Sequence, residues 1–323
     1  MEKFLFLLSA FLLVWGLRLQ SDPASASKGN KFAALGMLIA IFSAVIMPLE
    51  NSKSNLIWII IPLSVSATLG YIIAKKIEMT SMPQMVSIFN GLGGLSAVLL
   101  SFTEINKWII FPDAYEIIVV VVLLSSLFIG SVAFTGSLLA FAKLDGYKWS
   151  EKLTLPFQHI INIVFIFMIL VCSYLFISSS DVTYLYLIIF LSFVYGIFFV
   201  APIGGADMPV VISLLNSFTG ITAALTGIIF GNIVMLLGGI LVGAAGTILT
   251  VLMCNAMNRS LLNVIIGGFS SSGPSNENKE QGDIKEISDS DFAVQLFYSN
   301  KVIIVPGYGL AVAQAQKLCK EIQ

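Results

Sequence analysis

Two stretches of this sequence place the same polar residues at the same spacing inside long apolar runs. Residues 82–97 and 208–223 match at a constant offset of 126 positions. In each, a serine, an asparagine and a glycine follow one another three and then four residues apart, which puts all three on one face of a helix. The identical pairs are Met82/Met208, Pro83/Pro209, Ser87/Ser213, Asn90/Asn216, Gly94/Gly220 and Ala97/Ala223.

These repeated polar faces have two explanations, and the sequence leaves both open. Serine, asparagine and glycine let helices approach closely and hydrogen-bond to each other within a membrane. Alternatively, paired polar faces line a water-accessible path, as internal repeats do near the midplane of transporters. An asparagine cannot take up and release a proton, but its amide can hold water.

Asp207 is the only carboxylate between Asp181 and Glu277. An ionised aspartate at the bilayer centre costs about 2.5–3.5 kcal/mol, so such carboxylates usually serve transport. Asp207 also precedes Met208-Pro209, just as Ser81 precedes Met82-Pro83. It could therefore be an N-cap at the membrane surface, where the helix dipole stabilises a negative charge.

Small and basic residues near the last apolar run complete the membrane candidates. Gly239 and Gly243 form a G-x-x-x-G pattern, and Gly246 follows three residues later. This pattern predicts a helix-packing face or, as the alternative, a close approach to a channel. Arg259 lies just past the run and could serve either as an anchor at the membrane surface or in coupling.

A glycine turn near the end of the sequence suggests nucleotide binding. Gly307-x-Gly309-x-x-Val312 follows a predicted strand at 302–305 and opens a predicted helix. Glycines in this setting allow a tight turn, and the helix N-terminus receives a pyrophosphate. The spacing by itself is a weak signal.

The elements that position these residues are set by composition. The 323 residues are 57% hydrophobic and 11% charged, whereas soluble domains carry about a quarter charged residues. Most of the chain must therefore lie in lipid, where a spanning helix needs about 20 apolar residues. We predict about nine such helices, at roughly 3–20, 32–49, 55–74, 82–102, 115–142, 158–178, 182–201, 208–229 and 231–254.

Charge and ligand counts narrow the class of protein. The net charge of −1 predicts no nucleic-acid partner, which would require a basic patch. A single histidine and three widely spaced cysteines predict no metal site.

Basic residues predict the orientation of the chain, because they gather on the cytoplasmic side. With the C-terminus inside and the N-terminus outside, nine basic residues near the membrane lie inside and three outside. The inner set is Arg18, Lys28, Lys31, Lys75, Lys76, Lys143, Lys148, Lys152 and Arg259, and the outer set is Lys3, Lys53 and Lys107. The basic residues that follow the first apolar run predict that this run is retained as a span and not cleaved.

The sequence therefore divides into three parts. Residues 1–268 are predicted to form an all-α polytopic membrane domain. Residues 269–300 are a flexible acidic linker containing a short helix, because their Ser/Gly/Asn-rich start cannot bury apolar surface. Residues 301–323 are predicted to be the first βα unit of a Rossmann-like domain.

Taken together, these motifs resemble the beta subunit of the proton-translocating NAD(P) transhydrogenases. The resemblance covers nearly the whole length. Its most specific stretches are Glu78–Pro83, Phe134–Ser137, Gly204–Val211, Leu215-Asn216, Cys254–Ser260 and Pro306–Gln316.

The resemblance implies that hydride transfer between NAD(H), bound by the alpha subunit, and NADP(H), bound by beta, is coupled to inward proton flow across a bacterial inner membrane. It also implies an assembly containing two alpha–beta units. Asp207, Asn216, Gly246 and Arg259 fall on positions that the family uses for proton translocation and coupling. The NADP(H) pyrophosphate turn falls on Gly307, Tyr308, Gly309, Leu310, Ala311 and Val312.

Two departures from the family qualify these expectations. Some members have a protonatable histidine where this chain has Asn90, so Asn90 and Asn216 would position water while an alpha-subunit helix supplies a protonatable residue. The sequence also stops just after the glycine turn, so we expect residues 1–323 alone not to catalyse hydride transfer. The alternatives are an ion or solute transporter with a nucleotide-sensing tail, or a non-catalytic fragment that only packs with partner helices.

Overall fold

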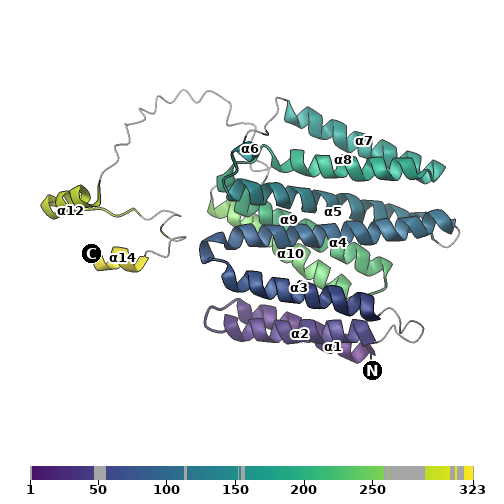
Figure 1. The fold of residues 1–323 in the computed structure, drawn as a ribbon, viewed down its shortest axis with the longest axis horizontal. Helices are drawn as coiled ribbons and strands as arrows, with labels where there is room; N and C mark the ends of the chain where they lie inside the picture. The colour runs from purple at the N-terminus through teal and green to yellow at the C-terminus, as the bar shows by residue number, and fades with distance from the viewer. Residues whose placement is uncertain are drawn as a thin grey trace.

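A computed structural model describes residues 2–46, 56–112, 115–151, 153, 157–257, 261, 288–305, 310 and 316–322. Figure 1 shows the long helices lying side by side with their axes roughly parallel. In chain order the long helices are α1 (Glu2–Gln20), α2 (Ala26–Ile46), α3 (Leu56–Lys76), α4 (Met82–Ile110), α5 (Ile117–Leu144), α7 (Gln158–Ser179), α8 (Val182–Val200), α9 (Met208–Ile229) and α10 (Ile233–Ala256). Short elements are η3 (Met79–Ser81), α6 (Lys148–Glu151), η5 (Gly205–Asp207), α12 (Asp289–Tyr298) and α14 (Gln316–Ile322).

Each predicted span coincides with one of the long helices, but not all of them qualify as spans. Within the described residues, seven helices, α3 to α5 and α7 to α10, are long and apolar enough to cross a membrane. The apolar part of α1 is the shorter segment Phe4–Gln20, and α2 carries Lys28 and Lys31 in its first two turns. The structure therefore shows a multi-pass helical membrane protein and does not confirm the count of nine.

The helix α4 is longer than predicted. The expected span ended at residue 102, whereas α4 continues to Ile110 and ends where the Phe111 amide donates to the carbonyl of Lys107. The expected span marked only the apolar run, and the helix continues past it through the polar residues Thr103, Glu104 and Lys107. Residues 103–110 form about two further helical turns, with Glu104 and Trp108 on the buried face.

The helix α5 lies at the centre of the packed helices, in contact with α4, α8 and α9. Half of the most apolar 18-residue segment of α5 is buried. Close approach depends on small residues at the crossings, since a Cβ at Gly196 of α8 would collide with Thr135 of α5, and one at Gly136 would meet Leu215 of α9 at 3.2 Å. This packing buries a cluster between α5 and α8 and a second cluster beside α9.

The first two helices form a tight hairpin, which contacts α10 through α1. Ser9 Oγ donates to the carbonyl of Gly36 at 2.9 Å, and a Cβ at Gly29 would lie 2.6 Å from the carbonyl oxygen of Gly16. By contrast, none of the most apolar 18-residue segment of α3 is buried by the described residues. The side chains of α3 are therefore available to lipid or to other membrane helices.

The predicted βα unit is not confirmed. Residues 301–305 have no regular secondary structure and are all exposed. A strand is stable only when its N–H and C=O groups pair with a neighbouring strand, and the described residues contain no strand that could pair with it. The short helices that the sequence predicted in the linker and at the end are present as α12 and α14.

Candidate functional site

The repeat found in the sequence begins with matching backbone turns. The 3₁₀ turn η3 leads directly into α4, and η5, offset by the same 126 positions, leads directly into α9. Ser81 and Asp207 occupy the N-cap positions, but neither side chain makes a cap hydrogen bond. The positions are those of caps, but the side-chain bonds are absent because both residues have the backbone angles of the turn (φ −96°, ψ 6° and φ −90°, ψ −1°), not the extended conformation of a capping residue.

The first repeat forms a helix pair with α5. Ser87 Oγ donates to the carbonyl of Ser137 at 2.7 Å, and Asn90 Nδ2 donates to Ser137 Oγ at 3.0 Å. Asn90 is only 7% exposed, and its Oδ1 atom is buried without a hydrogen-bond partner. The first asparagine is therefore held between two helices, with one acceptor atom unused.

The second repeat forms a helix pair with α10. Ser213 Oγ donates to the carbonyl of Gly246 at 3.1 Å, and Ser217 Oγ donates to the carbonyl of Gly243 at 2.8 Å. Thr247 shares that carbonyl and lies 2.7 Å from Ser217 Oγ. A Cβ at Gly246 would lie 2.9 Å from the amide nitrogen of Ser217, so the glycine face of α10 is a packing face as predicted.

The two pairs share one backbone geometry. A Cβ at Gly94 would meet the carbonyl oxygen of Gly130 at 2.7 Å, and a Cβ at Gly220 would meet that of Gly239 at 2.9 Å. The partner helices thus correspond at an offset of 239 − 130 = 109, and Ser137 and Gly246, which accept the matching serine bonds, give the same offset. The sequence match at a constant offset of 126 positions relates α4 to α9 only. It does not extend to α5 and α10, because these helices correspond at an offset that is smaller by 126 − 109 = 17 positions.

The polar side chains of the two pairs differ. Gly91 and Ser137 of the first pair correspond to Ser217 and Gly246 of the second, so the serine stands on the opposite helix. Asn90 bonds to Ser137, but its counterpart Asn216 faces a position that has no side chain. Asn216 is half-buried and makes no side-chain hydrogen bond within the part of the chain that the structure describes.

Asp207 lies at the end of this site where the helices α4 and α9 begin. It is half-buried, and the next residue, Met208, belongs to the same buried cluster as Cys254 of α10. The loop leading to Asp207 is held by Lys143 at the end of α5. The Lys143 ammonium group donates to the carbonyls of Val200, Ala201 and Ile203, where a positive charge is favoured by the C-terminal end of the α8 dipole.

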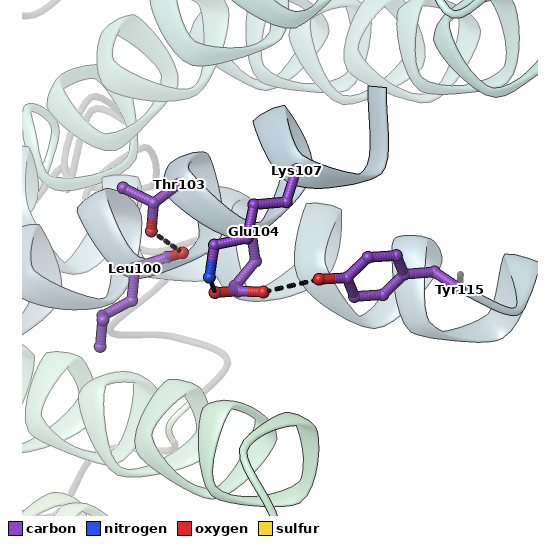
Figure 2. A network of polar contacts seen from close by, with 5 residues as sticks. All are labelled: Leu100, Thr103, Glu104, Lys107 and Tyr115. Atoms are coloured by element: carbon purple, nitrogen blue, oxygen red, sulfur yellow. Dashed lines mark hydrogen bonds and ion pairs between the residues drawn. The ribbon is translucent and has the colours of Figure 1, made fainter. Parts of the chain in front are cut away.

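A second polar cluster lies at the opposite end of α4, and the sequence analysis did not find it. Figure 2 shows the Glu104 carboxylate between Lys107 and Tyr115, with Lys107 Nζ at 2.5 Å from one oxygen and the Tyr115 hydroxyl at 3.0 Å from the other. Desolvation, followed by the hydrogen bond to the Glu104 carboxylate, raises the pKa of the Tyr115 phenol. Tyr115 therefore keeps its proton and acts as the donor.

Comparison with known proteins identifies the family. A family model described as NAD(P) transhydrogenase beta subunit matches residues 2–323. NAD(P) transhydrogenase subunit beta of Rhodospirillum rubrum is 38% identical over 328 residues, which cover 98% of this chain and 69% of the relative. The same match is found for the protein of a named strain of that organism.

This chain belongs to the NAD(P) transhydrogenase beta-subunit family. The role of the family is proton-coupled hydride transfer, so the chain is an oxidoreductase subunit. Its long apolar helices agree with a subunit that lies in a membrane.

The structure brings together part of the predicted transhydrogenase site. Asn90, Asn216 and Gly246 lie in the two matched helix pairs, and Asp207 opens the second of them. Arg259 and five residues of the glycine turn lie outside the described residues, and Leu310 is half-buried. Those outside are Gly307, Tyr308, Gly309, Ala311 and Val312.

Proposed function

We propose that residues 1–268 form the proton-translocating membrane part of the transhydrogenase, and that they couple hydride transfer between NADH and NADP+ to inward proton movement. The observation that carries this proposal is the asymmetric repeat. Two helix pairs with one backbone geometry hold buried polar side chains. Asn90 is hydrogen-bonded, whereas Asn216 has no partner among the described residues.

The two asparagines position water in this mechanism. Within the residues that the structure describes, Asn90 Oδ1 is a buried acceptor without a partner, and the half-buried amide of Asn216 has none. A buried water typically makes about three hydrogen bonds to such groups. The amides therefore order water between the helix pairs, while the proton itself is bound by a carboxylate.

Asp207 is the proton-binding group at the end of the site where α9 begins. It is half-buried, and its carboxylate makes no cap bond to the amides of α9. Lys143 fixes the loop that leads to it. Proton binding at Asp207 is thus linked to the position of the α8–α9 connection.

The nucleotide part of the proposal concerns residues 301–323 as the start of the NADP(H)-binding domain. Gly307 to Val312 would hold the pyrophosphate, and NADP+ when bound accepts the hydride. Leu310 is the one member of this turn that the structure describes, so the support comes from family membership and not from geometry.

The proposed assembly contains an alpha subunit that binds NAD(H) and contributes membrane helices, including a protonatable residue, with two alpha–beta units in the complex. The name of the Rhodospirillum rubrum relative supports an alpha partner, and the uncovered apolar surface of α3 offers room for its helices. We place the protein in the bacterial inner membrane with nine spans, the N-terminus outside and the C-terminus inside, as the basic residues predict.

The test of this function is Asp207→Asn in the assembled transhydrogenase, reconstituted in sealed vesicles with a pH-sensitive dye inside. We expect proton-coupled NADPH formation to fall at least about tenfold, a barrier increase of about 1.4 kcal/mol. Asp181→Asn is the matched control. Asp181 caps α8 through a 2.9 Å bond from the Thr183 amide, and asparagine caps equally well.

Equal rates in Asp207→Asn and wild type would show that Asp207 does not bind the transported proton. Proton movement that persists in vesicles lacking nicotinamide nucleotides would instead indicate a transporter.

A further inference from the structure

A buried stripe of small and polar residues runs along α4 well beyond the repeat. Its members are spaced alternately three and four residues apart, so they lie on one helix face. All are buried: Ser87, Asn90, Gly94, Ala97, Ser101 and Glu104. At about 1.5 Å per residue, the stripe covers about 25 Å, most of the thickness of a hydrocarbon core.

Polar atoms without partners occur along this stripe and on the facing helix. Asn90 Oδ1 and Ser101 Oγ on α4, and Ser126 Oγ on α5, are buried and make no hydrogen bond to any described residue. Buried polar atoms are nearly always bonded to protein or to water. Three such atoms on two adjacent helices point to water between α4 and α5.

Glu104 ends the stripe, and it is unusual in its setting. It is the only carboxylate within the seven membrane-capable helices of the described chain, and it is 6% exposed. Its neighbour Lys107 has a side chain that is 60% exposed. The Glu104 carboxylate thus lies between the exposed Lys107 side chain and the buried stripe.

Among the described residues, Lys107 and Tyr115 contact Glu104 directly, and Glu116 at the start of α5 is exposed. Cys172 of α7 belongs to the buried cluster that contains the neighbouring Ile105, and Tyr184 of α8 packs against that cluster. The described helix α9, which packs against α4, has no titratable side chain, and α5 has only Lys143 at its far end.

We infer that Glu104 binds and releases the transported proton at the end of α4 opposite to Asp207. This inference rests on the proposed function. A proton from water adds to a carboxylate oxygen of Glu104, which breaks the ion pair while Lys107 keeps its charge. When Glu104 releases the proton to water between α4 and α5, the carboxylate becomes charged again and pairs with Lys107.

The amide of Asn90 cannot bind and release a proton. Glu104 would supply a group that can, on the same helix of this chain. The two lie 14 residues apart on the same helix face, about 21 Å along the axis. The close contact between Gly94 and Gly130 lies between them, so water would have to bridge this distance outside that contact.

The experiment compares Glu104→Gln, Glu104→Asp and Glu116→Gln in the assembled transhydrogenase, reconstituted in sealed vesicles. Glutamine is nearly isosteric with glutamate but cannot bind a proton at neutral pH. We expect Glu104→Gln to lower the proton-coupled rate at least about tenfold, consistent with the loss of a proton-transfer group. Glu104→Asp should keep most of the rate, and Glu116→Gln, with the same change of charge at the same end, should equal wild type.

Infrared difference spectroscopy separates proton binding from a purely structural ion pair. We expect wild-type protein to show a protonated-carboxyl band that titrates with pH, vanishes in Glu104→Gln and shifts in frequency in Glu104→Asp. The band is measured in wild type and in Glu104→Asp as well, so it decides the question even if the glutamine variant fails to assemble.

If wild-type vesicles couple NADPH formation to proton movement and Glu104→Gln leaves that rate unchanged, the inference is overturned. It is also overturned if no protonated-carboxyl band shifts in Glu104→Asp. Wild-type vesicles that make NADPH without moving protons would instead refute the proposed function.

Discussion

The α4–α5 and α9–α10 pairs have the same backbone contacts and different polar side chains. In both, a glycine of the first helix packs against a backbone carbonyl of the second, and the serine three residues before the asparagine donates to a carbonyl across the interface. In the first pair Asn90 is bonded to Ser137. In the second, Gly246 replaces that serine, and Asn216 has no partner within the described chain.

The difference teaches that close packing and polar chemistry are separable in this protein. The interface has room for only one small side chain at this level, and it comes from α5 in the first pair and from α9 in the second. The backbone distance is therefore preserved while one asparagine is fixed and the other is free to bind water. Substitutions can test the two properties separately.

The largest effect is expected from Gly239→Ala in the second pair. A Cβ at Gly239 would collide with the backbone of Ala224 and lie 2.7 Å from the carbonyl oxygen of Gly220, so α9 and α10 must move apart. Overpacking of this kind costs about 1–3 kcal/mol, and we expect a value near the top of that range in denaturant titrations of the purified protein. Gly238→Ala is the matched control, because its Cβ has no atom within 4 Å, and a similar loss in both variants would contradict this account of the interface.

The next effect is expected from Lys143→Met. Position 143 corresponds to the exposed Leu252 in the second pair, so within the described residues only the first pair has a lysine bonded to the loop before Asp207. Hydrogen bonds from a charged group contribute about 1.5–3 kcal/mol, and we expect a loss of about 2 kcal/mol in unfolding together with weaker proton coupling. Lys143→Arg should restore both, whereas Lys148→Met, which removes an exposed charge nearby, should change neither.

A smaller effect is expected from Ser137→Ala, which makes the first pair resemble the second. Removal of the hydroxyl leaves the Asn90 amide buried without its partner, at a cost of about 1–2 kcal/mol. Thermal unfolding should show this loss, and Ser125→Ala on the exposed face of α5, where the serine bonds only within its own helix at 2.8 Å, should not. If both serines proved equally dispensable, the Asn90 bond would not stabilise the pair.

The smallest effect is expected from Ser217→Ala in the second pair. Thr247 continues to donate to the carbonyl of Gly243 at 2.8 Å, so no buried group is left unsatisfied. Hydrogen bonds between membrane helices average about 0.6 kcal/mol, and a shift of that size in the same unfolding assay is the expected result. A loss larger than that of Ser137→Ala would reverse the proposed difference between the pairs.

The sequence predicted where the helices lie because lipid demands long apolar segments, and each predicted span is a helix. It placed Asn90 and Asn216 on matching faces, since residues three and four apart share a face on any helix. It did not single out Glu104, which lies just beyond the apolar run at residues 82–102 on which the expected span was based. It left open whether Asp207 caps its helix. Ser81 and Asp207 occupy N-cap positions but end 3₁₀ turns, so neither side chain makes a cap bond.

The sequence by itself determined the membrane class, the repeat and the family, since each depends on composition and on local order along the chain. Only the tertiary structure decided which helix faces which. The partners of Ser87 and Ser213 lie 50 and 33 residues away, in helices whose sequences show no corresponding match. The contrast between Asn90 and Asn216 therefore arises from packing, because a single hydroxyl on the neighbouring helix determines whether each amide has a partner.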